Sequence, residues 1–265
     1  MAPLGSAPAS NDTTAKKREG RQQRDASEAG EPSLANRTAL ISGGASGIGL
    51  AVAHRMSRAG ATGAIVDINA SDAAIRNMHA LAADLRQANE IDRLAEVLGS
   101  TKRLPDLLVL CAGVGVHERL GEGDPSKWRD VLDVNVMSVL RLVRAFLPSM
   151  QEADSGGDVV IVSSVAATNP YPYGGVYGAS KAALNSIAET LRLEAGPTVR
   201  VLRISPGVVD TAFFSNMVSG GPTVQSIGAG ALSAEDVAEA IVWAVTRPRH
   251  VAVNELVIRP AGQEF

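Results

Sequence analysis

A tyrosine and a lysine four residues apart are the residues in this sequence that could most directly do chemistry together. Tyr177 and Lys181 lie in the run GGVYGASKAALNS, residues 174–186, whose other residues are mostly small. Four residues make about one helical turn, so both side chains project from one face of a helix. A phenol beside an ammonium is either an ordinary surface pair or a tuned acid.

A catalytic role would require a changed pKa at Tyr177. A free tyrosine has a pKa of about 10, which is too high for a base at neutral pH. The neighbouring ammonium favours the phenolate, so we expect the pKa of Tyr177 to fall toward the working range. The small residues 178–180 leave space for a cofactor against this helix face. The alternative is an i,i+4 pair in solvent.

A glycine-rich turn follows the first expected strand. In ISGGASGIGL, residues 41–50, the glycines are Gly43, Gly47 and Gly49. Such glycines allow a tight turn, a close backbone approach to a pyrophosphate and close packing of helix on sheet. The helix N-terminus then offers free N–H groups to the anion. The alternative is a purely structural turn.

An acidic residue ends the second expected strand. Asp67 closes AIVD, where a carboxylate can accept hydrogen bonds from the hydroxyl groups of an adenosine ribose and would repel a 2′-phosphate. Arg76 lies too far along the chain to serve as a phosphate clamp. The sequence therefore favours NAD over NADP as cofactor. The alternative for Asp67 is a surface residue at a strand end.

The elements that must position these residues alternate along the chain. Apolar runs predict strands, and helical patterns lie between them. The expected strands are 37–42, 62–68, 78–85, 106–113, 157–164, 198–205 and 254–258, and the expected helices are 47–60, 72–77 (short), 88–100, 125–150, 175–195 and 233–246. Ser233 and Asp236 predict a capping box for the last helix. Strand–helix alternation indicates an α/β fold with a doubly wound parallel sheet, Rossmann-like, in a single domain.

Composition limits the kind of protein. The 265 residues have a formal net charge of −3 and a hydrophobic fraction of 45%, which suits a large core and disfavours a nucleic-acid partner. Cys111 is the only cysteine, so an intrachain disulfide is impossible. No apolar run approaches membrane-spanning length, and the N-terminus lacks the apolar region of a signal peptide. We expect a cytoplasmic protein without a membrane partner.

Residues 1–35 differ from the rest of the chain. They are rich in Ala, Ser, Gly, Pro and charged residues, and nearly lack large apolar ones. Such a segment cannot bury enough surface to offset its ordering entropy. We expect a disordered N-terminal tail, with a partner-binding arm as the alternative, followed by one dinucleotide-binding and catalytic domain at 36–265.

Several motifs together resemble the short-chain dehydrogenase/reductase family over residues 36–261. They are SGGASGIG (42–49), ADL (83–85), LCAG (110–113), VN (134–135), IVSS (161–164), YGASK (177–181) and SPGVVDT (205–211). The resemblance implies an oxidoreductase with catalytic residues Asn135, Ser164, Tyr177 and Lys181. Ser164 is preferred to Ser163 because it lies 13 residues before Tyr177, the family's spacing.

The resemblance also implies roles for these residues. Tyr177 would be the acid/base, Ser164 would hold the reacting oxygen, and Lys181 would bind the nicotinamide ribose. Asn135 would connect Lys181 to a proton relay. The implied cofactor contacts are Gly43, Ser46, Gly47, Ile48, Gly49, Asp67, Ile68, Asp84, Leu85, Cys111, Ala112, Gly113, Tyr177, Lys181, Pro206, Gly207, Val209 and Thr211. In LCAG, Leu110 and Cys111 replace the family's asparagines, which weakens one supporting contact.

The loops after the strands offer candidates for the substrate. Tyr171, Tyr173, Phe213 and Phe214 predict either an apolar substrate wall or simple loop packing. His117 is either an ordinary loop histidine or a substrate contact, and the histidines show no metal-ligand spacing, so we expect no metal. The Gly- and Ser-rich run 219–233 is typical of a mobile lid.

These observations favour an NAD-dependent oxidoreductase that interconverts a secondary alcohol and a ketone, with a small neutral or partly apolar substrate. Because VNELVIRPAGQ, residues 253–263, resembles reductases of small hydroxy acids in the family, an NADPH-dependent carbonyl or hydroxy-acid reductase is the alternative. A cofactor-sensing protein without catalysis is the second alternative. By family analogy, the helices at 125–150 and 175–195 form the interface of a homodimer or homotetramer.

Overall fold

Seven parallel strands form the central sheet of the computed structural model, which describes residues 33–70, 74–101, 104–228 and 230–264. The strands are β1 (Thr38–Ser42), β2 (Thr62–Asp67), β3 (Met78–Ala82), β4 (Leu107–Leu110), β5 (Gly157–Val162), β6 (Val199–Pro206) and β9 (Glu255–Ile258). Their order is β3-β2-β1-β4-β5-β6-β9, so the chain reverses its direction of winding between β1 and β4. Ligands bind at such a switch point in open α/β sheets.

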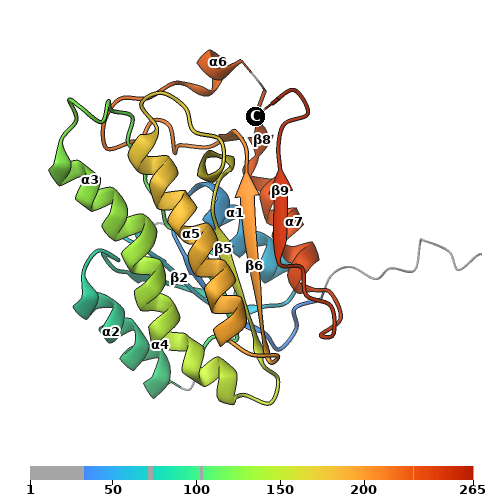
Figure 1. Cartoon of the computed structure of the whole chain (residues 1–265). Coiled ribbons are helices and arrows are strands. Elements are labelled where there is room, and N and C mark those ends of the chain that lie inside the picture. Colours follow the sequence, from blue (N-terminus) through green and yellow to red (C-terminus); the bar gives the residue numbers. More distant parts are fainter. Residues whose placement is uncertain (1–32, 71–73, 102–103, 229, 265) are drawn as a thin grey trace, which may run out of the picture. The chain divides into compact units, whose positions relative to one another are not determined.

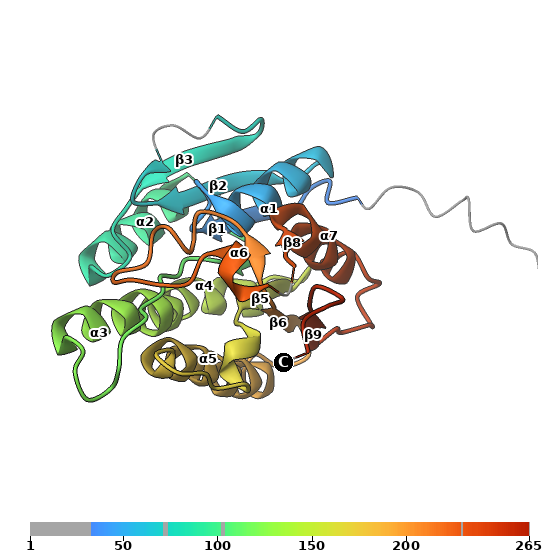
Figure 2. The same cartoon turned by 90° about the horizontal axis from the view of Figure 1, so that it is seen from above.

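Helices cover both faces of the sheet (Figures 1 and 2). One face carries α1 (Gly47–Arg58) and α7 (Ala234–Val245), and the other carries α2 (Ala88–Ser100), α4 (Ser138–Glu152) and α5 (Gly175–Glu194). Each side has its own buried core, with Met56 and Ile241 on the first and Phe146 and Leu184 on the second. The predicted doubly wound α/β fold is confirmed for the described residues between 33 and 264.

Shorter elements complete the domain. They are α3 (Pro125–Leu132), the π-helical turn η4 (Asp133–Met137), the 3-10 turn η5 (Val165–Ala167), α6 (Val224–Ile227) and the strand pair β7 (Val209–Asp210) with β8 (Leu232–Ser233). The predicted capping box is present, because the Ser233 hydroxyl accepts a hydrogen bond from the Asp236 amide while the Asp236 carboxylate accepts one from the Ser233 amide.

Four predicted elements differ from the structure. The helix expected at 125–150 is divided by the π turn at Asp133–Met137. The strands expected to reach 85 and 113 end at Ala82 and Leu110, where the backbone leaves the sheet. Residues 74–77 form a turn with Asn77 at φ +63°, not the short helix expected at 72–77, whose first two residues lie outside the described ranges.

Leu34 lies in the core, with 1% of its surface exposed, and its amide donates to the carbonyl of Ala59. The ordered domain therefore includes residues that we had placed in the tail. The prediction for residues 1–32 lies outside the described part of the chain. No helix among the described residues is both long enough and apolar enough to cross a bilayer.

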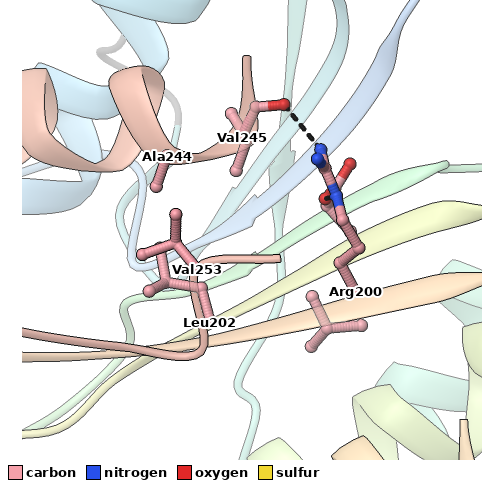
Figure 3. Close-up of a pocket in the computed structure, with 7 residues that line it drawn as sticks. Arg200, Leu202, Ala244, Val245 and Val253 are labelled. Carbon is pink, nitrogen blue, oxygen red and sulfur yellow. Dashed lines mark hydrogen bonds and ion pairs between the residues drawn. The ribbon is translucent and has the colours of Figure 1, made fainter. Parts of the chain in front are cut away.

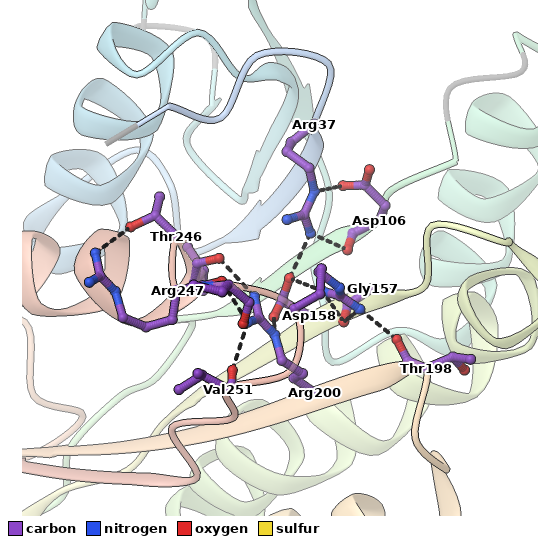
Figure 4. Close-up of polar contacts among 12 residues, drawn as sticks. Arg37, Asp106, Gly157, Asp158, Thr198, Arg200, Thr246, Arg247 and Val251 are labelled. Carbon is purple, nitrogen blue, oxygen red and sulfur yellow. Dashed lines mark hydrogen bonds and ion pairs between the residues drawn. The ribbon is translucent and has the colours of Figure 1, made fainter. Parts of the chain in front are cut away.

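A network of charged residues closes the amino ends of the strands (Figure 4). Asp158 accepts from Arg200 Nε at 2.6 Å, from Arg37 Nη2 at 2.8 Å and from Arg249 Nη1 at 3.0 Å. Asp158 and Arg200 are register partners on β5 and β6. Arg37 also donates to Asp106 at 2.9 Å, which ties the start of β1 to the start of β4.

Arg200 also holds the end of α7. Its guanidinium donates to four backbone carbonyls, at Val245, Arg247, Pro248 and Val251. Figure 3 shows the bond to Val245 beside a cavity of about 10 Å³, which is about the smallest space that can hold one water molecule. The amino end of the sheet is therefore packed and hydrogen-bonded, without room for a larger ligand at this point.

Candidate active site

A cavity of about 910 Å³ lies at the opposite end of the sheet, where the chain leaves the carboxyl ends of the strands. All residues predicted to contact the cofactor line it, as does Ser164. Asn135 does not line the cavity, because its side chain is fully buried behind the wall. One cavity thus collects residues from seven segments spread between Gly43 and Thr211.

The glycine turn between β1 and α1 is shaped for a close approach. Gly43 and Gly47 have φ values of +67° and +51°, which disfavour other residues. A Cβ at Gly43 would lie 2.8 Å from the backbone of Ala112, and one at Gly49 would collide with the carbonyl oxygen of Gly43. The chain therefore needs glycine at these positions to fold the turn tightly on itself and to bring it against the segment that follows β4.

The N-terminus of α1 suits an anion. Ser46 is the N-cap residue but its side chain makes no capping hydrogen bond, and the first turn contains no acidic residue. The first amides of a helix have no partners within the helix, and they carry the positive end of its dipole. Because this helix begins at the cavity, its N-terminus fits a bound pyrophosphate.

Asp67 lies beside this turn at the end of β2. Its Oδ2 accepts from the Ala45 amide at 3.2 Å, and its Oδ1 accepts from the Asn69 amide at 3.0 Å. These two bonds fix the carboxylate at the cavity rim. Ile68, the next residue, is 58% exposed.

Asp84 lines the same end of the cavity and is paired with Arg86. The guanidinium of Arg86 lies 2.8 Å from Oδ2 of Asp84, and this hydrogen bond lowers the pKa of Asp84. The Asp84 amide also donates to Glu90 at 2.6 Å. The loop after β3 is thereby held by its own side chains.

Tyr177 and Lys181 lie in the first half of α5, and both reach the cavity. The Lys181 ammonium is 5.9 Å from the centroid of the Tyr177 ring and donates to the Val162 carbonyl at 2.9 Å. Burial lowers the pKa of Lys181 to about 8. The lysine is therefore turned toward the end of β5 rather than bonded to the phenol.

The charge of Lys181 does not lower the pKa of Tyr177 in this structure. Burial raises the pKa of Tyr177, and a hydrogen bond with Ser164 opposes that rise only in part. The physical reason is desolvation, which disfavours the phenolate and the ammonium alike. Our sequence argument counted the charge of Lys181 and neglected the burial of both groups.

The two serines at the end of β5 have different surroundings. Ser163 is buried and donates to Asn185 Oδ1 at 2.7 Å and to the Lys181 carbonyl at 3.1 Å, so its hydroxyl is committed to α5. Both serines line the cavity, and the Ser164 hydroxyl accepts from the Ala166 amide at 3.1 Å. Ser164 also makes the hydrogen bond with Tyr177 described above, so its hydroxyl lies beside the phenol. Ser164 stays our predicted catalytic serine.

Asn135 occupies the π turn within the long helix. Its Nδ2 donates to the Val114 carbonyl and to Ser180 Oγ, both at 3.0 Å, and its Oδ1 accepts from the Val114 amide at 2.8 Å. A Cβ at Gly113 would lie 3.4 Å from both Asn135 Oδ1 and Lys181 Nζ. Asn135 thus fixes the segment after β4 beside Lys181, a contact that sequence reasoning did not anticipate.

Cys111 lies where the resemblance led us to expect an asparagine. Burial raises the pKa of its thiol to about 12, so it is a neutral wall residue. The hydroxyl of Ser42, at the end of β1, accepts from the Ala112 amide at 3.2 Å. Ser42 supports this segment and was missed as a site residue; its place at a strand end, directly before the glycine turn, was the available signal.

The segment after β7 closes over the cavity. The Val218 amide donates to the Gly115 carbonyl at 2.9 Å, and the His117 amide donates to the Ser219 carbonyl at 3.3 Å. The ring centroids of Phe213 and Tyr177 are 5.5 Å apart. Residues 213–218 therefore form a roof that is hydrogen-bonded to residues 115–117.

The aromatic loop residues divide into two groups. Tyr171, Phe213 and Phe214 line the cavity, as does His117. Tyr173 does not line it; its ring is 41% exposed, and its hydroxyl accepts from Arg119 at 3.3 Å. Within the described ranges, no group of three or more His, Cys, Asp or Glu residues could hold a metal ion.

Known proteins resemble this arrangement in sequence. Residues 37–220 match the family model described as short chain dehydrogenase. A protein of Staphylococcus epidermidis described as an uncharacterized oxidoreductase is 32% identical over 236 residues, which cover 84% of this chain and 97% of that protein. A relative from Staphylococcus aureus with the same description is 30% identical and covers 86% of this chain and 98% of its own.

Solved structures of dehydrogenases and reductases are similar to this chain in fold. An alcohol dehydrogenase from the archaeon Thermococcus sibiricus, complexed with 5-hydroxy-NADP, has a TM-score of 0.76 and 26% identity, covering 86% of this chain and 98% of its own. A 3-ketoacyl-(acyl-carrier-protein) reductase from Brucella melitensis, complexed with NADH, has a TM-score of 0.78 and 25% identity, covering 87% and 99%. The chain therefore belongs to the short-chain dehydrogenase family and is an oxidoreductase with a nicotinamide cofactor.

Proposed function

We propose that this protein is an NAD-dependent oxidoreductase that interconverts a secondary alcohol and a ketone, with Tyr177 as acid/base. The observation that carries the proposal is that Tyr177, Lys181 and Ser164 line the same cavity as the glycine turn and Asp67. A phenol, a hydroxyl and an ammonium thus share one space with a site shaped for a dinucleotide.

The chain's residues fit a dinucleotide from end to end. The glycine turn and the amides that begin α1 would hold the pyrophosphate, and Asp67 and Asp84 would hold the adenosine. Gly113, Lys181 and Thr211 would surround the nicotinamide half. When bound, the cofactor supplies hydride transfer, which is its own chemistry.

The side chains of α5 would manage the proton. Tyr177 gives its phenolic proton to a ketone oxygen in reduction and accepts the hydroxyl proton in oxidation. Ser164 donates a hydrogen bond to the same oxygen and thereby orients it toward Tyr177. Burial raises the pKa of Tyr177, so the phenol keeps its proton in the protein alone. The positive charge of an oxidised nicotinamide bound beside it would stabilise the phenolate.

Lys181 and Asn135 would support this proton transfer. Lys181 has one hydrogen bond to protein, at Val162, so further N–H donors remain for a ribose hydroxyl. The Asn135 side chain accepts a hydrogen bond from the Val114 amide and donates one to the Val114 carbonyl. These two bonds fix the backbone at Val114. We propose that Asn135 positions the wall against which Lys181 and the cofactor pack.

NAD is the proposed cofactor because of the carboxylate at Asp67. A bound 2′-phosphate would meet this charge, and no Lys or Arg stands among residues 43–49 of the turn. NADP complexes among the structural neighbours belong to those proteins and make NADPH-dependent carbonyl reduction the second candidate. Both candidates use the same Tyr177.

The first test is a fluorescence titration with NADH and, separately, NADPH. We expect tighter binding of NADH, and we expect Asp67→Ala to weaken NADH binding while it improves NADPH binding. Tighter NADPH binding by the unaltered protein would favour carbonyl reduction. Binding of neither cofactor would favour a protein without this activity.

The acid/base role is tested by Tyr177→Phe. We expect turnover of secondary alcohols to fall by about 100- to 10,000-fold while NADH binding is unchanged, because general acid–base catalysis contributes about that factor. Unchanged turnover in this variant would falsify the mechanism.

We also propose that the protein is a homodimer or homotetramer in the cytoplasm. Leu132, Met137 and Leu140, along α3, η4 and α4, are 42%, 38% and 39% exposed. Exposed apolar residues on adjoining helices are typical of a protein interface. Light scattering of the purified protein tests this, and a monomer at micromolar concentration would contradict it.

A further inference from the structure

We propose that Tyr171 and His117 form a second polar contact for the substrate, so that the preferred substrate carries a second uncharged oxygen function besides its reacting alcohol or ketone. This inference rests on the proposed function, because it names the substrate class of the same site. It is carried by the placement of the two rings, by their unused hydrogen-bonding groups and by the apolar walls around them.

Tyr171 is held by backbone and ring contacts rather than left mobile. A Cβ at Gly174 would collide with the Tyr171 ring, so the ring lies directly against the backbone of the residue that precedes α5. The Gly174 amide donates to the Tyr171 carbonyl at 3.2 Å. The His117 ring stacks on Tyr171 with centroids 6.3 Å apart and an interplanar angle of 25°. The pair is therefore fixed relative to the helix that carries Tyr177.

Both rings keep their polar groups available. Tyr171 and His117 line the cavity, and neither the phenolic hydroxyl nor the imidazole is hydrogen-bonded to another residue in the described part of the chain. Burial raises the pKa of Tyr171, so its hydroxyl stays neutral and can both donate and accept. Tyr171 is also close enough to influence the pKa of Tyr177, which places it near the reacting end of the cavity.

The surroundings favour an uncharged oxygen. The cavity lining includes the apolar side chains of Val165, Phe213 and Met217, and its polar side chains in these loops, Asn169 and Asn216, are uncharged. Arg119, the closest guanidinium in sequence, does not line the cavity and instead donates to Tyr173 outside it. A carboxylate or phosphate would find no guanidinium in this part of the cavity, whereas a hydroxyl or carbonyl oxygen would find Tyr171 and His117.

The test uses the whole protein saturated with oxidised cofactor, in which a ketone binds but cannot be reduced. Isothermal titration compares 1-phenyl-1,2-propanedione with propiophenone, which share the phenyl ring and one ketone. We expect the dione to bind about tenfold more tightly, which is the effect of one neutral hydrogen bond at a site that would otherwise stay unpaired. Tyr171→Phe should remove this difference and leave propiophenone binding unchanged.

Two further variants isolate the effect. His117→Phe keeps a ring against Tyr171 and should weaken dione binding several-fold, and Tyr173→Phe, outside the cavity, should change nothing. Equal binding of both ketones, binding of neither, or a retained preference in Tyr171→Phe would overturn the inference, as would tighter binding of the charged analogue benzoylformate. Failure of the proposed function would be distinguishable, because either the oxidised cofactor would not bind or Tyr177→Phe would leave turnover unchanged.

Discussion

Both ends of the sheet bury charged side chains, but these side chains differ in how many hydrogen bonds and ion pairs they make. At the amino end, Arg200 makes five hydrogen bonds. One is to Asp158, and four are to backbone carbonyls at the last residue of α7 and in the segment after it. At the carboxyl end, Lys181 is equally buried, at 5% exposed, and makes a single hydrogen bond to Val162 within the described chain. A salt bridge compensates the first charge, and no carboxylate compensates the second.

This difference distinguishes a buried charge that stabilises the fold from one that serves the candidate site. A buried charge whose hydrogen-bonding groups are all used is part of the fold, since each group has already exchanged water for protein. A buried ammonium with unused donors and a pKa lowered to about 8 is kept at a cost in stability. Proteins keep such groups where a ligand completes the set. The carboxyl end therefore holds the site, and the amino end holds the strands together.

The largest effect is expected at the carboxyl end. Lys181→Met should reduce turnover by about 100- to 10,000-fold, because on the proposed mechanism it removes the ammonium that supports the acid/base group. It should not reduce stability, since the buried charge is uncompensated. Steady-state kinetics and chemical unfolding measure the two quantities, and Lys127→Met, at the surface, is the control. A loss of activity that merely followed a loss of folded protein would erase the contrast between the two ends.

The converse is expected at the amino end. Arg200→Leu should destabilise the protein by about 3–5 kcal/mol, because it leaves buried partners unpaired. Activity per folded molecule should be unchanged. The control is Arg203→Leu on the same strand, where the partner Glu255 is half exposed. A surface pair contributes at most about 1 kcal/mol. Equal effects in urea unfolding would show that the Asp158 network is not special.

Much of the fold and of the candidate site could be predicted from the sequence. The strand–helix alternation, the glycine turn and the Tyr177–Lys181 spacing are local patterns, and each predicts a contact within one element or one turn. The sheet order and the common cavity then follow from the right-handed connections of parallel strands. The amino-end network could not be predicted, because Arg37, Asp158 and Arg249 lie far apart in sequence and each is an ordinary charged residue alone.

The errors at the site have one physical source. Spacing shows which side chains share a helix face, but not how much water surrounds them. The pKa of Tyr177 is raised because the fold buries it. The hydrogen bond from Asn135, on the π turn, to the Val114 carbonyl joins two segments that are 21 residues apart in sequence. Likewise, nothing in the sequence distinguished Tyr171, inside the cavity, from Tyr173, two residues later and outside it.

The uncompensated charge also predicts a pH dependence of stability. Below pH 8, Lys181 is protonated in the folded and unfolded states alike. Between pH 8 and 9, only the unfolded state, whose lysine pKa is 10.5, binds the proton, so the free energy of unfolding should rise by about 1 kcal/mol. Cys111 opposes part of this rise from about pH 8 upward, because its thiol, with a pKa of 9.0 in the unfolded state, ionises only after unfolding.

The comparison that isolates this effect is wild type against Lys181→Met, with unfolding followed in urea at pH 8.0 and 9.0. The variant should lack the rise. If both proteins respond alike to pH, Lys181 is not the group responsible, and the ammonium is better compensated than its hydrogen bonds indicate.

The smallest effect is expected in the roof, where the carboxyl end must adapt to a substrate. A Cβ at Gly115 would lie 2.9 Å from Phe213 and 3.1 Å from Met217, which are flexible side chains that can shift. Gly115→Ala should therefore raise KM about threefold and cost only about 1 kcal/mol of stability, the low end of the range for overpacking. Gly121→Ala, in the same loop with nothing within 4 Å, is the matched control. A large loss of stability in Gly115→Ala would mean that the roof is packed as rigidly as the amino end, and the distinction between an adaptable end and a closed end would not hold.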